Sequence, residues 1–153
     1  MNRLHPRVRL VWMLRAVVVA GVVGAVAYVL NRVTLELPVY VPVGVFVVFL
    51  VVGVGFAILR YRLWGYEVRE DSLYLERGVL TRVRTVVPFV RIQHVDSARG
   101  PVERLLGLAS TVVYTAGSRG ADVQIPGLTP EGSDELQDRL KGLAIRAEGD
   151  DAV

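Results

Sequence analysis

Two long stretches without a single charged residue dominate the N-terminal part of the chain, one covering residues 16–30 and the other residues 37–59. Only the short segment NRVTLE separates them. A helix rises about 1.5 Å per residue, so about 20 helical residues cross a hydrocarbon core of roughly 30 Å. We therefore predict two transmembrane helices, over residues 12–32 and 38–59, joined as a hairpin.

Two other interpretations of these apolar runs are open. The runs could be core helices of a soluble protein, although two such runs flanked by arginine are hard to accommodate in water. The arginine-rich start, the first run and the tripeptide Ala25-Val26-Ala27 also resemble a secretory signal with its cleavage site. Cleavage after Ala27 would leave only a short stretch before the second run, so an uncleaved signal-anchor is the favoured interpretation.

Arginine residues flank both runs and predict how the hairpin is oriented. Positively charged residues favour the cytoplasmic side of a membrane, and the connecting segment contributes only Arg32. We expect a plasma-membrane protein with two spans and both termini in the cytoplasm, residues 1–11 forming a cytoplasmic basic arm. The expected interface anchors are Trp12, Arg15 and Trp64, with a core position as the alternative for Trp64. The flanking arginines are Arg3, Arg7, Arg9 and Arg15 before the first run, and Arg60, Arg62 and Arg69 after the second.

Small residues recur at helical spacing within both runs. Gly21 with Ala25, and Gly53 with Ala57, are four positions apart and would let two helices approach closely. The pattern predicts helix packing within the hairpin, with oligomerisation or docking against another membrane protein as the alternative. Neither run carries an ionisable residue near its middle, the usual mark of an ion path, so a small transporter is not favoured.

The charge of the chain divides at the end of the second run. The first 59 residues carry five arginines and one glutamate, whereas residues 60–153 carry 13 basic and 14 acidic residues. The basic balance therefore belongs to the membrane flanks, and nucleic acid is not an expected partner. Residues 60–104 carry nine basic and six acidic residues, and residues 105–153 carry four and eight. The positive half is nearest the bilayer, where anionic lipid attracts basic residues.

Residues 60–145 have the pattern of a small domain of short strands closed by one helix. Alternating or β-branched segments between polar turns predict six or seven strands, with a hairpin turn at residues 118–120. The segment Thr129-Pro130-Glu131 supplies an N-cap, a first-turn proline and a first-turn acid for the closing helix. We expect a disordered tail over residues 146–153. The predicted strand segments include YRLWGYEV, SLYLERGVL, TRVRTVVPFV, STVVYTAG and ADVQIPGL, and the helix has an apolar side made by Leu136, Leu140 and Leu143.

The stretch PFVRIQHVD raises a catalytic interpretation, because His94 stands two residues before Asp96. The chain has no cysteine and only one other histidine, which excludes thiolate chemistry and a histidine metal cluster. Neighbouring serines lack the G-x-S-x-G elbow of a nucleophile. On a strand, residues 94 and 96 share a face and can hydrogen-bond simply to satisfy a turn. We therefore predict scaffold rather than an active site, and neither cofactor, metal nor small-molecule substrate is expected.

The residues that follow predict a short helical connection. Gly100 and Pro101 end the strand, and Pro101 is a suitable first residue for the helix VERLLGL. Gly107 can close this helix in a left-handed conformation. The side expected to be buried consists of Leu105, Leu106 and Leu108.

Five segments in order give the chain a family resemblance. They are LERGVL, PFVRIQHVD, VERLLGLASTVVYTAG, VQIPGL and the closing helix, all placed after a two-helix anchor. In these features the chain resembles the bacterial pleckstrin-homology-like (PH-like) family of YdbS-type membrane proteins, with Val87-Pro88 where that family has isoleucine-proline. The resemblance implies an α+β membrane protein, in which a two-helix transmembrane hairpin precedes a PH-like antiparallel β-barrel or sandwich capped by a C-terminal helix.

The resemblance also implies a function without catalysis. We expect a membrane-anchored interaction module at the inner leaflet that docks protein partners, often related membrane proteins, or copies of itself. The alternative is a peripheral sensor of anionic lipid headgroups, although the first hairpin loop carries Glu70 and Asp71, which would repel a phosphoinositide. An enzyme using His94 is a third, disfavoured hypothesis. The residues expected to contact lipid or a partner are Arg60, Arg62, Arg82, Arg84 and Arg91.

Overall fold

The computed structural model describes residues 1–117 and 121–152, so the predicted turn at 118–120 lies outside the described residues. The chain divides into two compact units: residues 9–62 form a helical unit, and residues 1–8 together with 63–153 form a strand-containing unit.

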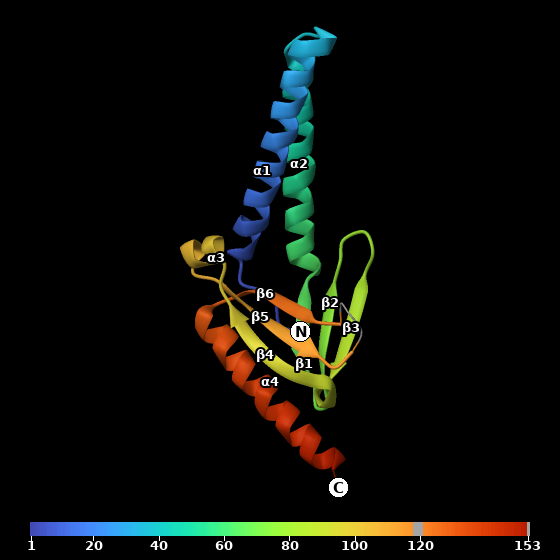
Figure 1. The fold of residues 1–153 in the computed structure, drawn as a ribbon, viewed down its shortest axis with the longest axis vertical. Coiled ribbons are helices and arrows are strands. Elements are labelled where there is room, and N and C mark those ends of the chain that lie inside the picture. Colours follow the sequence, from blue (N-terminus) through green and yellow to red (C-terminus); the bar gives the residue numbers. More distant parts are fainter. Residues whose placement is uncertain (118–120, 153) are drawn as a thin grey trace. The chain divides into compact units, whose positions relative to one another are not determined.

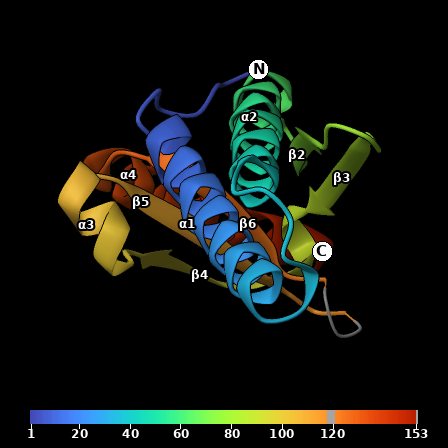
Figure 2. The same ribbon diagram turned by 90° about the horizontal axis from the view of Figure 1, so that it is seen from above.

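The helical unit consists of two long helices, α1 (Val8–Leu30) and α2 (Tyr40–Leu63), which lie side by side in both views (Figures 1 and 2). Both are long and apolar enough to cross a membrane. Only 22% and 11% of their most apolar windows are buried, whereas a core helix of a soluble protein would be mostly buried. Their exposed valine and leucine surface therefore needs an apolar surrounding, which a bilayer provides.

A tight turn joins the two helices. A π-helical turn, Asn31–Leu35, ends at Glu36, whose positive φ of 49° reverses the chain. The buried Asn31 side chain fixes this turn by donating to the Leu37 carbonyl and accepting from the Leu37 N–H, both at 2.8 Å. A polar residue at the end of an apolar run thus satisfies backbone groups that the turn would leave unpaired.

The described residues of the strand-containing unit form two three-stranded antiparallel sheets and two α-helices (Figure 1). One sheet has the order β1-β2-β3 and the other β4-β5-β6, so the described strands do not close into one barrel. The α+β fold with a C-terminal helix is confirmed. The strands are β1 (Gly65–Val68), β2 (Ser72–Arg77), β3 (Val83–Pro88), β4 (Ile92–Ala98), β5 (Ala109–Thr115) and β6 (Val123–Leu128), and the helices are α3 (Pro101–Leu106) and α4 (Pro130–Asp151).

The closing helix α4 packs on β4, β5 and a 3₁₀ turn at Phe89–Arg91. Its predicted N-cap is confirmed, because the Thr129 hydroxyl accepts from the Gly132 N–H at 3.0 Å. Leu136 and Leu140 are buried against the sheet, as their spacing predicted. The helix continues to Asp151, so residues 146–151 are helical rather than a disordered tail.

A buried hydroxyl network ties α4 to the second sheet. The Ser133 Oγ lies 2.8 Å from the Ser97 Oγ and 2.9 Å from the Thr111 Oγ1, and donates to the Ser110 carbonyl at 3.2 Å. Ser133, Thr111 and Ser110 are at most 1% exposed. Because each of these buried hydroxyls has a partner, hydrogen bonds offset the cost of desolvating them while the network fixes the helix position.

The N-terminal arm belongs to the strand-containing unit. The backbones of Asn2 and Tyr66 exchange hydrogen bonds of 2.7 and 3.1 Å, and the His5 N–H donates to the Gly127 carbonyl. Gly127 has a φ of +67°, and a Cβ added there would lie 2.8 Å from the Val8 Cβ. Glycine therefore lets the arm pass close to β6, and residues 1–8 are an ordered part of this unit.

Two further local predictions are wrong. The helix α2 continues to Leu63, so the strand predicted from residue 61 begins only at Gly65. Leu105 is 86% exposed, although its position in VERLLGL predicted burial, while Leu108 is 1% exposed. The helix α3 is short and ends at Leu106, before the left-handed Gly107 (φ +66°). Only one side of so short a helix faces the core, and Leu105 is on the other side.

Candidate functional site

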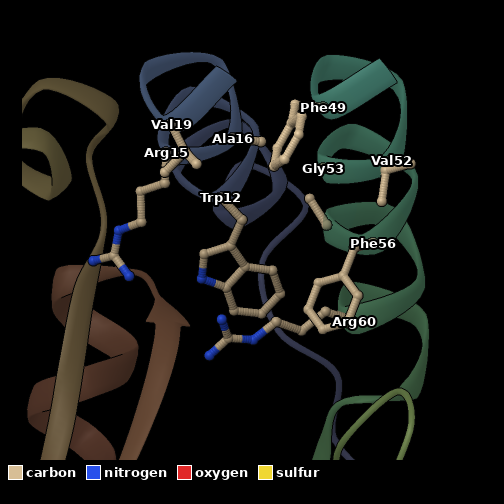
Figure 3. A pocket seen from close by; sticks show the side chains of 10 residues that line it. Trp12, Arg15, Ala16, Val19, Phe49, Val52, Gly53, Phe56 and Arg60 are labelled. Atoms are coloured by element: carbon tan, nitrogen blue, oxygen red, sulfur yellow. The ribbon is translucent and has the colours of Figure 1, made fainter. Parts of the chain in front are cut away.

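A pocket of about 330 Å³ opens between α1 and α2 and is built entirely from the helical unit (Figure 3). Small residues line the pocket where the two helices are in contact. A Cβ added at Gly53 would lie only 2.9 Å from the Ala16 Cβ, and Ala57 is 3% exposed. The two α2 residues predicted to pack helices, Gly53 and Ala57, therefore lie where the helices approach each other.

The α1 side of this contact uses different residues from those predicted. Ala20 is fully buried, and a Cβ added at Gly24 would lie 3.0 Å from the Phe46 Cβ. Gly21, in contrast, faces open space, and with Ala25 it lines a separate hollow of about 250 Å³. The packing residues on α1 are Ala16, Ala20 and Gly24, which recur at every fourth position. The sequence predictions did not include this repeat.

Two predicted interface anchors, Trp12 and Arg15, and one predicted contact arginine, Arg60, line the pocket (Figure 3). The Arg60 guanidinium lies over the Trp12 ring at 4.4 Å from its centroid. A second cation–π contact, of 5.0 Å, joins Arg9 and Tyr61. Such contacts gain strength when they are shielded from water, and Trp12 is only 6% exposed. This end of the helix pair is thus basic and aromatic.

Trp64 has a different position. It is 3% exposed and belongs to the strand-containing unit, directly before β1. The structure therefore supports the core alternative for Trp64 rather than an interface anchor.

The five arginines predicted to form a contact surface are divided between the two units. Arg60 and Arg62 belong to the helical unit, and Arg82, Arg84 and Arg91 to the strand-containing unit. Arg82 and Arg84 both approach the Glu76 carboxylate, at 3.4 and 3.8 Å. Their side chains remain 60% and 66% exposed, so these pairs contribute little to stability. One carboxylate thus offsets part of the charge of two arginines.

The outer strand β3 presents a second candidate surface. Among the described strands, β3 pairs only with β2, so its other edge is free. Apolar side chains are exposed along it: Val83 is 42% exposed, Val86 54%, and Leu80 in the preceding loop 92%. An edge strand with unpaired backbone N–H and C=O groups and exposed apolar side chains is a template for pairing with another chain.

His94 takes part in a cross-strand contact. Its ring stacks on that of Tyr114, its neighbour on β5, at 4.2 Å between centroids and 15° between planes. Both rings thereby cover the same face of the sheet, the usual role of aromatic cross-strand pairs. The described residues contain no cluster of three or more His, Asp or Glu side chains that could hold a metal ion. His94 thus has a structural contact within the second sheet.

Comparison with known proteins assigns the chain to a class. The family model described as "Bacterial PH domain" matches residues 14–144. The chain is 36% identical over 86 residues to the UPF0699 transmembrane protein YdbS of Bacillus subtilis (strain 168). The aligned part covers 56% of this chain and 52% of that protein, so the chain spans about half the length of this curated relative. No solved structure matches the chain significantly.

The chain belongs to the bacterial PH domain family, because the match covers most of its 153 residues. The predicted resemblance is thereby confirmed. Two membrane-capable helices and a relative named as a transmembrane protein make it a membrane-associated PH-like module. The family and the relative suggest a module without catalytic activity.

Proposed function

We propose that this protein is a non-catalytic docking module, held at the inner leaflet of the plasma membrane by two spans, and that β3 pairs with an acidic strand of a membrane-protein partner. Anchoring confines the module to the membrane surface and raises its effective concentration for membrane partners, so a weak contact suffices. The observation that carries the proposal is the free β3 edge with its exposed valines and arginines.

Both the fold and the charge distribution support the orientation. Residues 1–8 and 63–153 belong to one compact unit, which supports placing the segments before α1 and after α2 on the same side of the membrane. Arginines are concentrated in these two segments and at the helix ends joined to them, whereas the turn between the helices contributes only Arg32. The positive-inside rule then favours the cytoplasm for both termini.

The charges on β3 favour a protein partner of a particular kind. Arg84 lies on the edge strand and Arg82 directly before it, so an incoming strand with carboxylates would find complementary charge. A second copy would bring its own Arg82 and Arg84 to the same edge, which makes pairing of two β3 strands less favourable. An acidic strand from another protein is therefore the better occupant.

The alternative function, a sensor of anionic lipid on the same strand face, has weaker support. Glu76 offsets one of the two charges of Arg82 and Arg84, and each lipid-facing arginine contributes only about 1 kcal/mol to membrane attraction. This face alone would therefore give little lipid binding.

Site-specific photocrosslinking tests the docking proposal in the native membrane. A photoreactive side chain at Val86 should capture a peptide rich in carboxylates, and the adduct should disappear in the Arg84→Glu variant. The matched control is Ile145 on α4, which is also apolar and 61% exposed. Adducts that are the same at both positions, or that survive Arg84→Glu, would count against pairing at β3. An adduct between two copies of the protein would indicate self-association at β3 instead of an acidic partner.

A further inference from the structure

We propose that the pocket between α1 and α2 binds one anionic phospholipid, with the headgroup phosphate at Arg15 and Arg60 and an acyl chain in the apolar part. The proposal uses the membrane association established above and does not rest on docking at β3. The pocket volume of about 330 Å³ is at the lower end of the range of roughly 300–1,000 Å³ that ligand pockets have.

The pocket extends along the helices, because its lining residues cover about two turns of α1 and three turns of α2. The small residues Ala16, Gly53 and Ala57 line the pocket together with larger apolar residues of both helices. The extent and apolar lining of the pocket favour a flexible hydrocarbon chain as its occupant. Such a chain gains contacts with the pocket and stays in apolar surroundings. The larger residues are Val19 on α1 and Phe49, Val52 and Phe56 on α2.

The polar end of the pocket carries positive charge. The Arg60 guanidinium lies by the Trp12 ring, and the Arg15 side chain extends from the same end of α1 on the side away from α2 (Figure 3). No acidic side chain lines the pocket, and Glu36, in the turn at the other end of the helices, is the one acidic residue among residues 9–62. Guanidinium groups bind phosphate by strong, charge-assisted hydrogen bonds, and basic pockets between membrane helices are typical headgroup sites.

The position of Arg15 along α1 strengthens the assignment. Arg15 lies three positions inside the predicted span of residues 12–32, or roughly 5 Å at the usual helical rise. A charged side chain at that depth is costly unless it reaches the interface or meets an opposite charge. A phosphate at the headgroup level provides that charge, and Trp12 next to it has the amphipathic ring typical of this region.

Lipid retention by the full-length protein tests the proposal. The protein is reconstituted in nanodiscs of equal parts phosphatidylglycerol and phosphatidylcholine with identical acyl chains, released, and examined by native mass spectrometry. We expect one phosphatidylglycerol to be retained in preference to phosphatidylcholine. Arg15→Gln should weaken this preference about fivefold, the effect of one basic residue at a membrane surface. Arg32→Gln, at the other end of the helices, should leave it unchanged.

Two adjacent valines give a matched test of the pocket itself. Val51 and Val52 are 65% and 64% exposed, so tryptophan at either position spares the helix packing, but only Val52 lines the pocket. Val52→Trp should abolish lipid retention, and Val51→Trp should not. Equal retention of the two lipids, or equal effects of the two tryptophans, would overturn the proposal. A mass that corresponds to two copies of the protein, and that only Val52→Trp abolishes, would also overturn the proposal. A second copy would then occupy the pocket. Arg84→Glu, which tests docking at β3, should leave lipid retention unchanged.

Discussion

The close contact of α1 with α2 can be tested at two glycines of the same helix. A Cβ added at Gly53 would lie 2.9 Å from the Ala16 Cβ, a distance that real Cβ atoms do not reach, whereas one at Gly55 would meet nothing within 4 Å. Both residues are in α2, two positions apart, so a valine changes the intrinsic helix propensity similarly at both. Only Gly53→Val therefore disturbs the contact between the helices.

Overpacking of a tight contact typically costs about 1–3 kcal/mol, because side chains and backbones must shift to admit the added methyl groups. We expect Gly53→Val to lower the free energy of unfolding of the helical unit by this amount. Gly55→Val should change it by less than about 0.5 kcal/mol, the usual effect of a substitution without new contacts.

The assay follows Trp12, which lies in the helical unit. The chain has two tryptophans, so in a Trp64→Phe background Trp12 alone reports on the helix pair. Unfolding of the reconstituted full-length protein by a denaturing detergent, monitored by Trp12 fluorescence, gives the stability of each variant. Equal losses at Gly53 and Gly55, or an unaffected Gly53→Val protein, would refute the helix packing described above.

Three further predictions concern the strand-containing unit. Leu108→Ala should cost about 2–5 kcal/mol because Leu108 is 1% exposed, while Leu105→Ala, at 86% exposure, should be nearly neutral in denaturant titration. Thr129→Ala should lower stability by about 1 kcal/mol, because the Thr129 hydroxyl accepts from the Gly132 N–H. Amide hydrogen exchange in the first turn of α4 should increase, and unchanged exchange would contradict the N-cap. Burial raises the pKa of Tyr66 above 10.0, an effect that Arg139 opposes, so the folded state keeps its proton longer than the unfolded chain. This contribution to stability should therefore be lost as the pH rises from about 10.0 through the higher pKa of the folded state, and Tyr66→Phe should reduce that loss in pH-dependent melting.

The sequence was sufficient for those elements that depend on local chemistry. The two uncharged runs predicted both long helices, because length and apolarity alone decide whether a helix can span a bilayer. Thr129 predicted the start of α4, and Gly107 the left-handed end of α3, because caps and positive φ angles are set by single residues. Local signals of this kind do not depend on how the chain is packed.

Features set by packing could not be read from spacing. Gly21 and Ala25 have the same separation as Ala16 and Ala20, and only the rotation of α1 about its axis decides which pair meets α2. The exposure of Leu105 depends likewise on how the short helix α3 is turned. The pairing of Asn2 with Tyr66 joins distant parts of the chain and has no local signal.

The candidate site was predicted in its parts but not as a whole. Trp12 and Arg15 were expected at the membrane boundary, and Arg60 among the contact arginines, for reasons of charge and position alone. Their meeting at one pocket depends on the register between α1 and α2, which places Arg60 over the Trp12 ring. The apolar edge of β3 could not be predicted either. The sequence around Val83 and Val86 is that of any strand, and only the sheet order shows that β3 is an edge strand.

The most direct test of a module held at the inner leaflet by a two-span anchor uses single cysteines in intact cells. The chain has no cysteine, so Leu80→Cys and Val33→Cys, at positions 92% and 74% exposed, each provide one reactive thiol. Leu80 lies between β2 and β3, and Val33 in the turn between α1 and α2. With a membrane-impermeant maleimide, we predict labelling of Val33→Cys and protection of Leu80→Cys until the cells are opened. Labelling of Leu80→Cys in intact cells would contradict the account.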